Sequence, residues 1–280
     1  MALDAANSPE LIQETVHTML IQPLQETSQF LAAGPRIIPT AGPVRLPKIT
    51  SGAVPEWYGP NELIADDDVL FDEVTLMPST MKSLKTMTKF SNELARQSVV
   101  ALESALRERL VSDVAKAVDA HLFGATGDGI TTPRGLFAYE GVQNLAVTAD
   151  LTLDNLMDAQ GLALGANSNL GTSKWVLTSA EFISLRKLKD TDGRYLLQPD
   201  PTQAGTYVLF GIPVIIKNGI AGSALVDFGQ IAVATDVAPA VTVLDQTFGD
   251  FDQQAIRVVY RVDAAPLNPE AIVTLTVPAV

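Results

Sequence analysis

The sequence of 280 residues contains no cysteine and only two histidines, His17 and His121. Without cysteine the chain cannot form a disulfide framework, a thiolate metal site or a cysteine nucleophile. Two scattered histidines do not predict a zinc site or a hydrolase triad, and no serine stands in a nucleophile-elbow pattern. We therefore expect no catalytic residue, no metal and no cofactor, and we predict that the chain is not an enzyme.

Basic residues are also few, with 19 Lys and Arg against 32 Asp and Glu and a formal net charge of -13. Proteins hold nucleic acid mainly through basic contacts to phosphates, so this deficit argues against a surface that binds DNA tightly. No stretch approaches the length of apolar sequence that crosses a membrane, and the first residues lack the pattern of a signal peptide. We expect no membrane partner.

One long stretch, residues 91–123, contains neither glycine nor proline, and its apolar residues recur three or four positions apart. This period predicts an amphipathic helix, about 45–50 Å long at 1.5 Å per residue. We expect Ser91 to cap its start and Gly124 to end it in a left-handed conformation. The pattern does not hold strict heptads, which favours a beam along one side of the molecule over a coiled coil.

Prolines are concentrated before this helix, at positions 35, 39, 43, 47 and 55. Proline opposes helix formation, so we expect an extended arm with few partners inside its own chain. Upstream, Ser8, Pro9 and Glu10 predict the start of a short helix.

Residues 55–78 hold seven acids and no base. Their pattern predicts a long hairpin, with extended flanks around Trp57–Tyr58 and over residues 69–77. A lone two-stranded hairpin is marginal in water, and this one would expose large apolar side chains. We therefore expect it to lie on another surface, with Trp57 and Tyr58 as aromatic anchors of a protein interface.

The remainder of the chain mixes helices and strands without regular alternation, which predicts an α+β fold. Residues 81–90 suit a helix or a strand, and we favour the strand. Helices are predicted over residues 151–164 and 179–190, the second capped by Thr178 or Ser179. Strands are predicted over residues 174–178, 224–235 and 239–245. A strand pair with a kink at Gly211–Pro213 is predicted over residues 207–218, and two strands broken by Pro266 and Pro269 over residues 255–277.

Two glycine-containing segments imitate ligand loops. GATGDG at residues 124–129 follows a helix instead of preceding one and lacks the Gly-Lys-Ser/Thr ending of a phosphate loop. The segment at residues 189–195 begins like a calcium loop, but its twelfth position is Pro201. We interpret both as turns.

Taken together and in this order, these segments resemble the HK97-fold major capsid proteins of tailed bacteriophages. The similarity covers most of residues 30–280. It is carried by the proline-rich arm, by a hairpin that opens with VPEWYG and closes on VTLMP, and by the spine helix that runs into DAHLFGATGDGITTPRGLF. It continues through KWVLTSAEFISLRKLKDTDGRYLLQP, LFGIPVIIKN and FDQQAIRVVYRVDAAPLNPEAIVTL.

The resemblance implies an α+β HK97-like capsid fold with a long spine helix, an extended hairpin loop, and peripheral and axial domains. The expected boundaries are 1–45 for the N-terminal arm, 46–78 for the extended loop, 79–136 with 244–280 for the peripheral domain including the spine at 91–123, and 137–243 for the axial domain.

The resemblance also implies a structural role in the virion, after assembly in the host cytoplasm. The chain would self-assemble, as a homo-oligomer of pentamers and hexamers, into an icosahedral shell that encloses packaged dsDNA without sequence-specific binding. A portal and a separate scaffolding protein are implied partners, and decoration proteins are left open. Two alternatives remain at this point: an encapsulin-type nanocompartment that holds cargo enzymes, and an α+β enzyme with an uncommon site.

Within that picture, the acidic hairpin would cross an adjacent subunit whose basic residues neutralise it. Covalent fusion of subunits is not expected, because residues 49–81 contain no lysine and the last strands offer Gln253, Gln254 and Arg261 instead of the amide and acid required. The expected interface residues are Trp57, Tyr58, Glu62, Leu63, Asp66, Asp67, Asp68 and Phe71 on the hairpin, with Arg36, Arg45, Lys48, Lys82, Lys85 and Lys89 as the bases.

Trp57→Ala should impair assembly without unfolding the subunit, because the lost apolar anchor serves the contact between copies. Circular dichroism would monitor the fold and electron microscopy the shells. Normal shells from this variant would remove the hairpin anchor from the hypothesis.

Overall fold

The computed structural model describes residues 28–40, 42–51, 57–60, 70–97, 102–147, 151–189, 192–193, 195 and 207–276. The short helix predicted near residue 9 lies outside these ranges. The helices are α1 (Gln29–Ala32), α2 (Asn92–Gln97), α3 (Leu102–Leu122), α4 (Leu153–Gly165) and α5 (Ser179–Arg186), with short 3-10 turns η2 (Leu136–Ala138), η3 (Phe228–Gln230), η4 (Gly249–Phe251) and η5 (Pro269–Ala271).

The strands form three sheets. A four-stranded sheet has the order β1-β10-β11-β4, a six-stranded sheet has the order β5-β12-β9-β6-β8-β7, and β2 pairs with β3 alone. The strands are β1 (Arg36–Pro39), β2 (Val44–Ser51), β3 (Leu70–Leu76), β4 (Leu84–Ser91), β5 (Gln143–Ala146), β6 (Ser173–Leu177), β7 (Val208–Leu209), β8 (Ile212–Ile216), β9 (Ser223–Asp227), β10 (Ile231–Phe248), β11 (Gln253–Pro266) and β12 (Ile272–Thr276).

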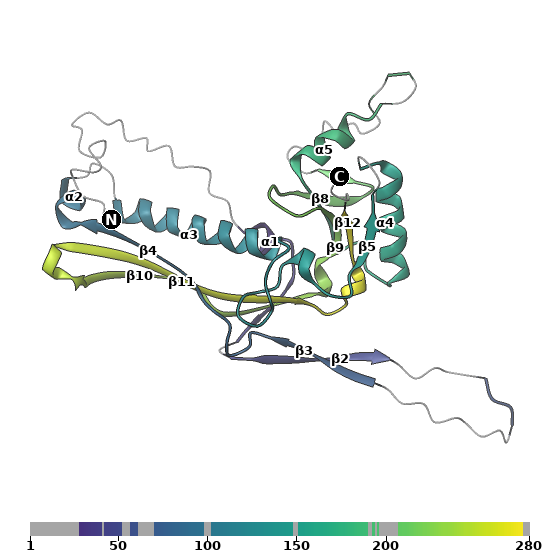
Figure 1. Ribbon diagram of the computed structural model, residues 1–280, viewed down its shortest axis with the longest axis horizontal. Coiled ribbons are helices and arrows are strands. Elements are labelled where there is room, and N and C mark those ends of the chain that lie inside the picture. The colour runs from purple at the N-terminus through teal and green to yellow at the C-terminus, as the bar shows by residue number, and fades with distance from the viewer. Residues whose placement is uncertain are drawn as a thin grey trace.

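Helix α3 runs along the four-stranded sheet as a beam, as predicted (Figure 1). Its side chains at Leu110, Val114, Val118 and Leu122 are buried in one core with the strands beneath. This spacing of three or four residues puts all four on the face that meets the sheet. The coiled-coil alternative is therefore unnecessary, since the chain's own sheet covers the apolar face.

The predicted start of the spine is confirmed, because the Oγ of Ser91 accepts a hydrogen bond from the backbone N–H of Leu94 at 3.2 Å. Between α2 and α3, residues 98–101 lie outside the described ranges. The described part of the predicted helix consists of two elements, α2, which begins at Asn92, and α3, which ends at Leu122. The outer ends lie one residue inside the predicted boundaries, and a single continuous helix over residues 91–123 stays a prediction.

The predicted left-handed conformation of Gly124 is wrong, since its φ is not among the positive values. A Cβ on Gly124 would lie 3.0 Å from the carbonyl oxygen of Ala120 and 3.1 Å from that of His121, so a side chain there would be tight. The close approach of the chain requires glycine more strictly at Gly135. A Cβ on Gly135 would lie 2.3 Å from the carbonyl oxygen of Gly124, and the N–H of Phe137 donates to that same oxygen at 3.0 Å. The turn after the spine therefore folds back tightly against the end of α3.

The six-stranded sheet forms the core of a second region, with α4 and α5 on its outside (Figure 1). Both helices begin with a capping box, Thr152 with Asn155 and Thr178 with Glu181. A capping box satisfies two backbone donors that a helix start otherwise leaves without a partner. The structure confirms both predicted helices, although the second ends at Arg186, and it confirms the strand between them. Residues 224–235 are divided between β9 and β10, and the strand predicted at 239–245 is a continuation of β10.

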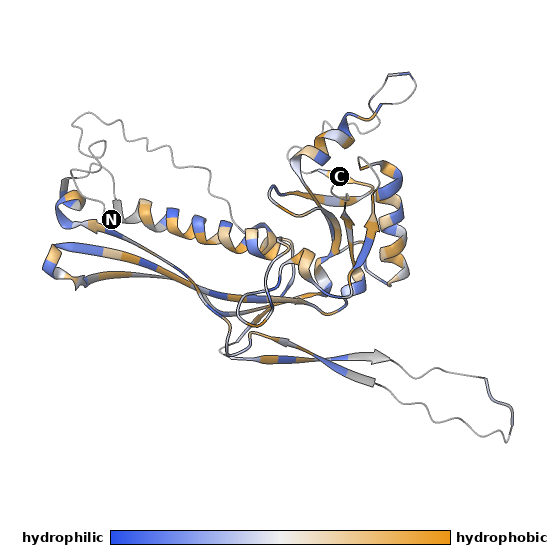
Figure 2. Ribbon diagram, in the orientation of Figure 1, coloured by the Kyte–Doolittle hydropathy of each residue, from blue (hydrophilic) through white to orange (hydrophobic). Residues whose placement is uncertain are grey.

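The hairpin is confirmed at its second strand, but the first strand predicted around Trp57–Tyr58 is wrong. Its two paired strands run from Val44↔Leu76 to Ser51↔Leu70, so the first strand precedes Trp57–Tyr58 and does not include them. Near the body, apolar and polar residues alternate in both strands, as Val44-Arg45-Leu46 and Val74-Thr75-Leu76 (Figure 2). Pro47 is tolerated because each strand of a two-stranded ribbon has one free edge, where proline loses no ladder hydrogen bond.

The arm also has more partners within its own chain than predicted. Residues Arg36–Pro39 pair in parallel with Ala232–Thr235, at the edge of the four-stranded sheet. Proline is compatible with an edge strand, which explains why a proline-rich segment still joins a sheet. Just before it, the ring of Phe30 is fully buried and meets Phe123 and Phe228 edge-on, with centroids 5.1 and 5.5 Å apart.

Phe30→Ala should destabilise the free subunit by about 3–5 kcal/mol, because it removes a fully buried ring and leaves a cavity. Urea unfolding measures the change. Phe251→Ala is the matched control, since that ring is 73% exposed and its loss should change stability by less than about 0.5 kcal/mol. Equal effects of the two substitutions would contradict the packing described.

Candidate assembly surfaces

The start of the arm is tied to the spine by a buried carboxylate, Asp119. It accepts hydrogen bonds from the hydroxyl of Ser28 at 2.6 Å and from the backbone N–H of Gln29 at 2.8 Å and Phe30 at 3.3 Å. The ammonium of Lys217, which follows β8, pairs with it at 3.1 Å. One side chain thus joins the arm, the spine and the six-stranded sheet. The only sequence signal was an acid next to Val118 in the apolar stripe, and sequence analysis missed it.

The base of the hairpin is fixed by a second buried carboxylate, Asp263 on β11. It accepts from the backbone N–H of Met77 at 2.7 Å and of Ala264 at 2.9 Å. Met77 has a left-handed φ of 55°, a conformation that is uncommon outside glycine. The bond to Asp263 therefore holds an unfavourable turn in place where the chain leaves the hairpin.

Arg261 supports the same turn from the neighbouring position on β11. Its guanidinium donates to the backbone oxygen of Pro78 at 3.2 Å and forms an ion pair with Asp236 of β10 at 3.3 Å. The hairpin is thus anchored at its base by β10 and β11. The sequence did not identify Asp236, Arg261 or Asp263 as residues that anchor the hairpin.

Two of the predicted basic residues, Arg45 and Lys48, belong to the hairpin itself and lie on β2. Arg45 pairs with Glu73 at 3.3 Å across the ribbon, and Lys48 stands opposite Asp72 in the register. The Arg45–Glu73 pair is largely exposed, so it contributes about 0–1 kcal/mol. Both bases therefore face acids of their own hairpin.

Of the hairpin residues predicted at the interface, Trp57, Tyr58 and Phe71 lie within the described ranges. Trp57 is fully exposed, at 103%, and Tyr58 is half-buried. Phe71 lies on β3, and its side chain is not described. Glu62, Leu63, Asp66, Asp67 and Asp68 are outside the described residues.

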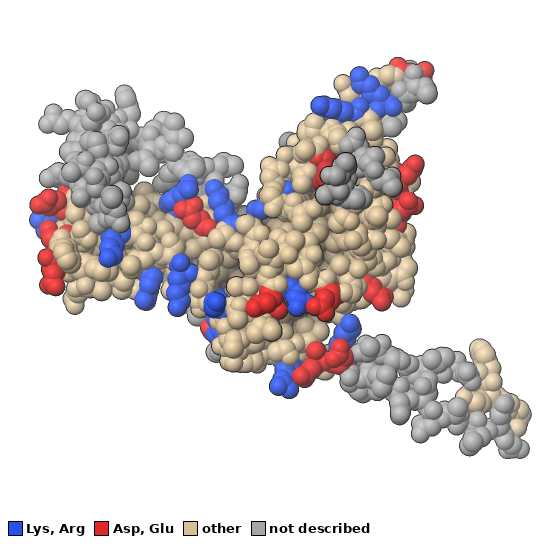
Figure 3. All heavy atoms as spheres, viewed as in Figure 1, with Lys and Arg blue, Asp and Glu red and all other residues tan. Residues whose placement is uncertain are grey.

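A basic face covers the side of the four-stranded sheet away from α3. It consists of Lys85, Met87 and Lys89 on β4 and of Arg257 on β11, which stands opposite Met87. The ammonium of Lys89 lies 3.8 Å from the ring centre of Phe248, a cation–π contact. Figure 3 shows Lys and Arg side chains along this side of the sheet. The alternation of the strand places these residues opposite core-facing ones such as Phe90.

The Lys and Arg residues predicted to contact a neighbouring hairpin do not form one surface. Lys85 and Lys89 share the basic face, Arg36 lies on the edge strand β1, and exposed Lys82 lies before β4 at the mouth of a cavity. Their proposed contact with a neighbouring hairpin stays a prediction.

The match to known proteins covers nearly the whole chain. A sequence model described as the phage capsid family matches residues 10–277. The chain belongs to the phage capsid family.

The relatives of this phage capsid chain agree with that assignment. The major capsid protein of Klebsiella oxytoca phage phiKO2 is 26% identical over 220 residues, which make up 75% of this chain and 49% of that protein. The chain therefore spans about half the length of this curated relative.

Solved structures confirm the predicted HK97-like α+β capsid fold. The capsid of a native GTA particle aligns with a TM-score of 0.79 at 20% identity, over 98% of both chains. A chain from Mycobacterium phage Adephagia aligns with a TM-score of 0.77 at 15% identity, again over 98% of both. The encapsulin alternative is not favoured, because the family matched is that of phage capsids.

Two aspartates of this capsid chain have pKa values shifted in opposite directions. Backbone N–H groups of Thr132, Ile130 and Thr131, together with the Thr131 hydroxyl, lower the pKa of Asp128 far below its usual range. Burial raises the pKa of Asp263, against the lowering effect of the N–H groups of Met77 and Ala264.

These shifts predict opposite pH dependences for two substitutions. A carboxyl group whose pKa is lowered on folding stabilises the folded state above the unfolded pKa of about 3.9, and this contribution is lost as the pH falls. A carboxyl group whose pKa is raised on folding contributes stability at low pH, and this contribution is lost as the pH rises. As the pH falls from 7 towards 4, the stability of the unmodified subunit should fall relative to Asp128→Asn and rise relative to Asp263→Asn. Denaturant unfolding of dissociated subunits at several pH values measures both. A trend of the same sign for the two variants would contradict the prediction.

Proposed function

We propose that this chain is the major capsid subunit of a tailed phage, forming pentamers and hexamers that close into an icosahedral shell around double-stranded DNA in the virion. The observation that carries the proposal is the hairpin β2–β3, which projects from the body (Figure 1), together with the full exposure of Trp57, which lies between its two strands in the sequence. A two-stranded ribbon cannot bury both of its faces alone. A neighbouring copy would supply the missing surface.

We propose that the subunit divides into an arm over 1–45, an extended loop over 46–78, a peripheral domain over 79–136 and 244–280, and an axial domain over 137–243. The sheets follow this division only in part. Strands β2 and β10 each span one of the proposed boundaries. Strand β12 lies in the sequence range of the peripheral domain but pairs with β5 and β9 of the six-stranded sheet.

The proposed contact between subunits combines charge with apolar burial. The acids of the hairpin would meet the basic face of the next copy, where Met87 is 47% exposed between Lys85 and Lys89. Exposed ion pairs add only about 0–1 kcal/mol each, so they set register and orientation. Apolar burial, repeated at every contact of the shell, would supply most of the free energy.

We propose a structural role and no catalysis. The described residues contain no group of three or more His, Asp or Glu that could hold a metal ion. Within the same residues, no helix combines the length and apolar character needed to cross a membrane. The net charge of -13 suits a container from which packed DNA must slide freely. A portal and a separate scaffolding protein are the partners we propose, and decoration proteins are left open.

Imaging of the purified protein tests the proposal directly. Negative-stain electron microscopy should show closed shells or their pentamers and hexamers, and sedimentation should show species far larger than one subunit. A compact single subunit at high concentration in every buffer would overturn the proposal.

Lys85→Glu should raise the protein concentration needed for assembly about fivefold, which corresponds to about 1 kcal/mol, because it places an acid opposite the acidic hairpin. The effect should shrink at 1 M salt, where the Debye length falls to about 3 Å. Light scattering against protein concentration measures it.

Lys85→Gln provides the graded control, since it removes the positive charge without adding a negative one. Its effect should be smaller than that of Lys85→Glu at low salt. Identical thresholds for both variants and the unmodified chain would remove Lys85 from the contact.

A further inference from the structure

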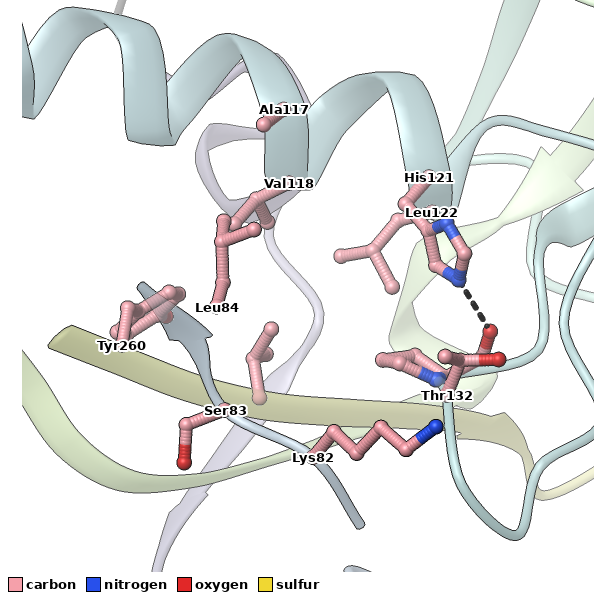
Figure 4. A pocket seen from close by; sticks show the side chains of 11 residues that line it. Lys82, Ser83, Leu84, Ala117, Val118, His121, Leu122, Thr132 and Tyr260 are labelled. Atoms are coloured by element: carbon pink, nitrogen blue, oxygen red, sulfur yellow. Dashed lines mark hydrogen bonds between the residues drawn. The ribbon is translucent and has the colours of Figure 1, made fainter. Parts of the chain in front are cut away.

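An open cavity of about 350 Å³ lies beneath the last turns of α3, where β4 begins (Figure 4). Its walls come from α3, from the start of β4, from β11 and from the loop at residues 132–133. Pockets of this size, lined mainly by apolar side chains with a few polar groups, are typical of binding sites. The apolar wall is formed by Leu84, Ala117, Val118, Leu122, Pro133 and Val262.

Polar groups stand at one side of this cavity. The imidazole of His121 is held by its Nε2, which lies 2.9 Å from the backbone oxygen of Pro133 (Figure 4). The exposed side chain of Lys82 stretches along the cavity towards Thr132 in the same view. The site thus combines an apolar interior with a positive charge at its mouth.

The more exposed of the two tryptophans is a candidate occupant of this cavity. Of its two tryptophans, Trp175 is 0% exposed and Trp57 is 103% exposed. Tryptophan is prominent among interface residues that contribute most to affinity, typically by filling a desolvated pocket on the partner. Residues 57–60 lie at the far end of the hairpin, which extends away from the body that holds the cavity (Figure 1). The cavity would therefore meet Trp57 of another copy.

Charge also matches the hairpin to the cavity. Residues 49–81 carry no Lys or Arg, and acids stand on both sides of Trp57, beginning with Glu56 and Glu62. An acidic segment entering this site would bring carboxylates towards the ammonium of Lys82. Complementary charges of this kind orient a contact while apolar burial supplies its free energy.

We propose that this cavity receives Trp57 of a neighbouring copy, with Lys82 facing the acids beside it. The inference rests on the proposed function, because only assembled copies bring a second hairpin to the site. It goes further because it names one cavity as the binding site and one side chain, Trp57, as the group that fills it.

Collisional quenching of tryptophan fluorescence by acrylamide tests the proposal. In dissociated subunits Trp57 is open to the quencher and Trp175 is not, so two components are expected. The quenchable component should be lost when shells form. Trp57→Phe identifies that component, because this variant should lack it in both states.

A substitution inside the cavity tests the location. Ala117→Phe fills the space from α3 and should raise the assembly threshold about tenfold or more, the effect of losing a strong interface contact. Ala120→Phe is the matched control, because Ala120 is exposed on the same helix and does not line the cavity. It should assemble at the normal concentration. In the double variant Trp57→Ala with Ala117→Phe, the threshold should rise no further than in the worse single variant, because both changes break one contact.

The outcomes separate this inference from the proposed function. Two results would contradict the placement of Trp57 in the cavity and leave the capsid role intact. One is shells of the unmodified chain in which acrylamide still quenches Trp57, and the other is Ala117→Phe shells in which Trp57 is protected from acrylamide. Protection by another segment of the same chain would appear already in dissociated subunits and would also contradict that placement. Failure of the unmodified chain to assemble under any condition would instead contradict the proposed function.

Discussion

A buried carboxylate at Asp119 connects the parts of this molecule. Its side chain is 1% exposed, and a charge so far from water is tolerated only when it is paired and hydrogen-bonded. The ammonium of Lys217 supplies the opposite charge, and the residues that open the arm supply three donors. Breaking one partner would leave the other charge uncompensated. The arm, the spine and the six-stranded sheet are therefore held in one relative position.

This fixed body gives the hairpin a firm base. The ribbon leaves the four-stranded sheet through a turn whose left-handed Met77 is held by Asp263 and whose next residue, Pro78, is held by Arg261. Backbone conformations of this kind persist when the surroundings over-determine them. The direction in which the paired strands of the hairpin leave the body is consequently set by buried contacts at its root.

The structure also explains why an acidic chain can assemble with itself. Its net charge of -13 would oppose association if it were spread evenly. Instead, bases lie together on the face of β4 and β11 that points away from α3, and acids without any base occupy residues 55–78. Separation of the two signs along the same chain would favour the proposed head-to-tail contact. Heterologous contacts of this type close into rings when the rotation between copies allows it.

Much of the fold could be predicted from the sequence because its signals are local. The spine has a helical period, α4 and α5 have capping boxes beside their first turns, and β4 alternates between a core face and a charged face. The order of these segments was enough to indicate the capsid family. Each of these features depends on residues within a few positions of one another, and the physical chemistry of helices and strands acts at that range.

The remaining features depend on residues far apart in the chain, and only the tertiary structure decided them. The pairing of β1 with β10, the strand that precedes Trp57 and the partners of Asp119 and Asp263 all join distant segments. A proline-rich segment looks unpaired in sequence because its partner strand lies nearly 200 positions later. The sequence by itself determined which segments are helical, extended, acidic or basic. Burial and long-range hydrogen bonding determined which of them meet, since those energies exist only once the chain is folded.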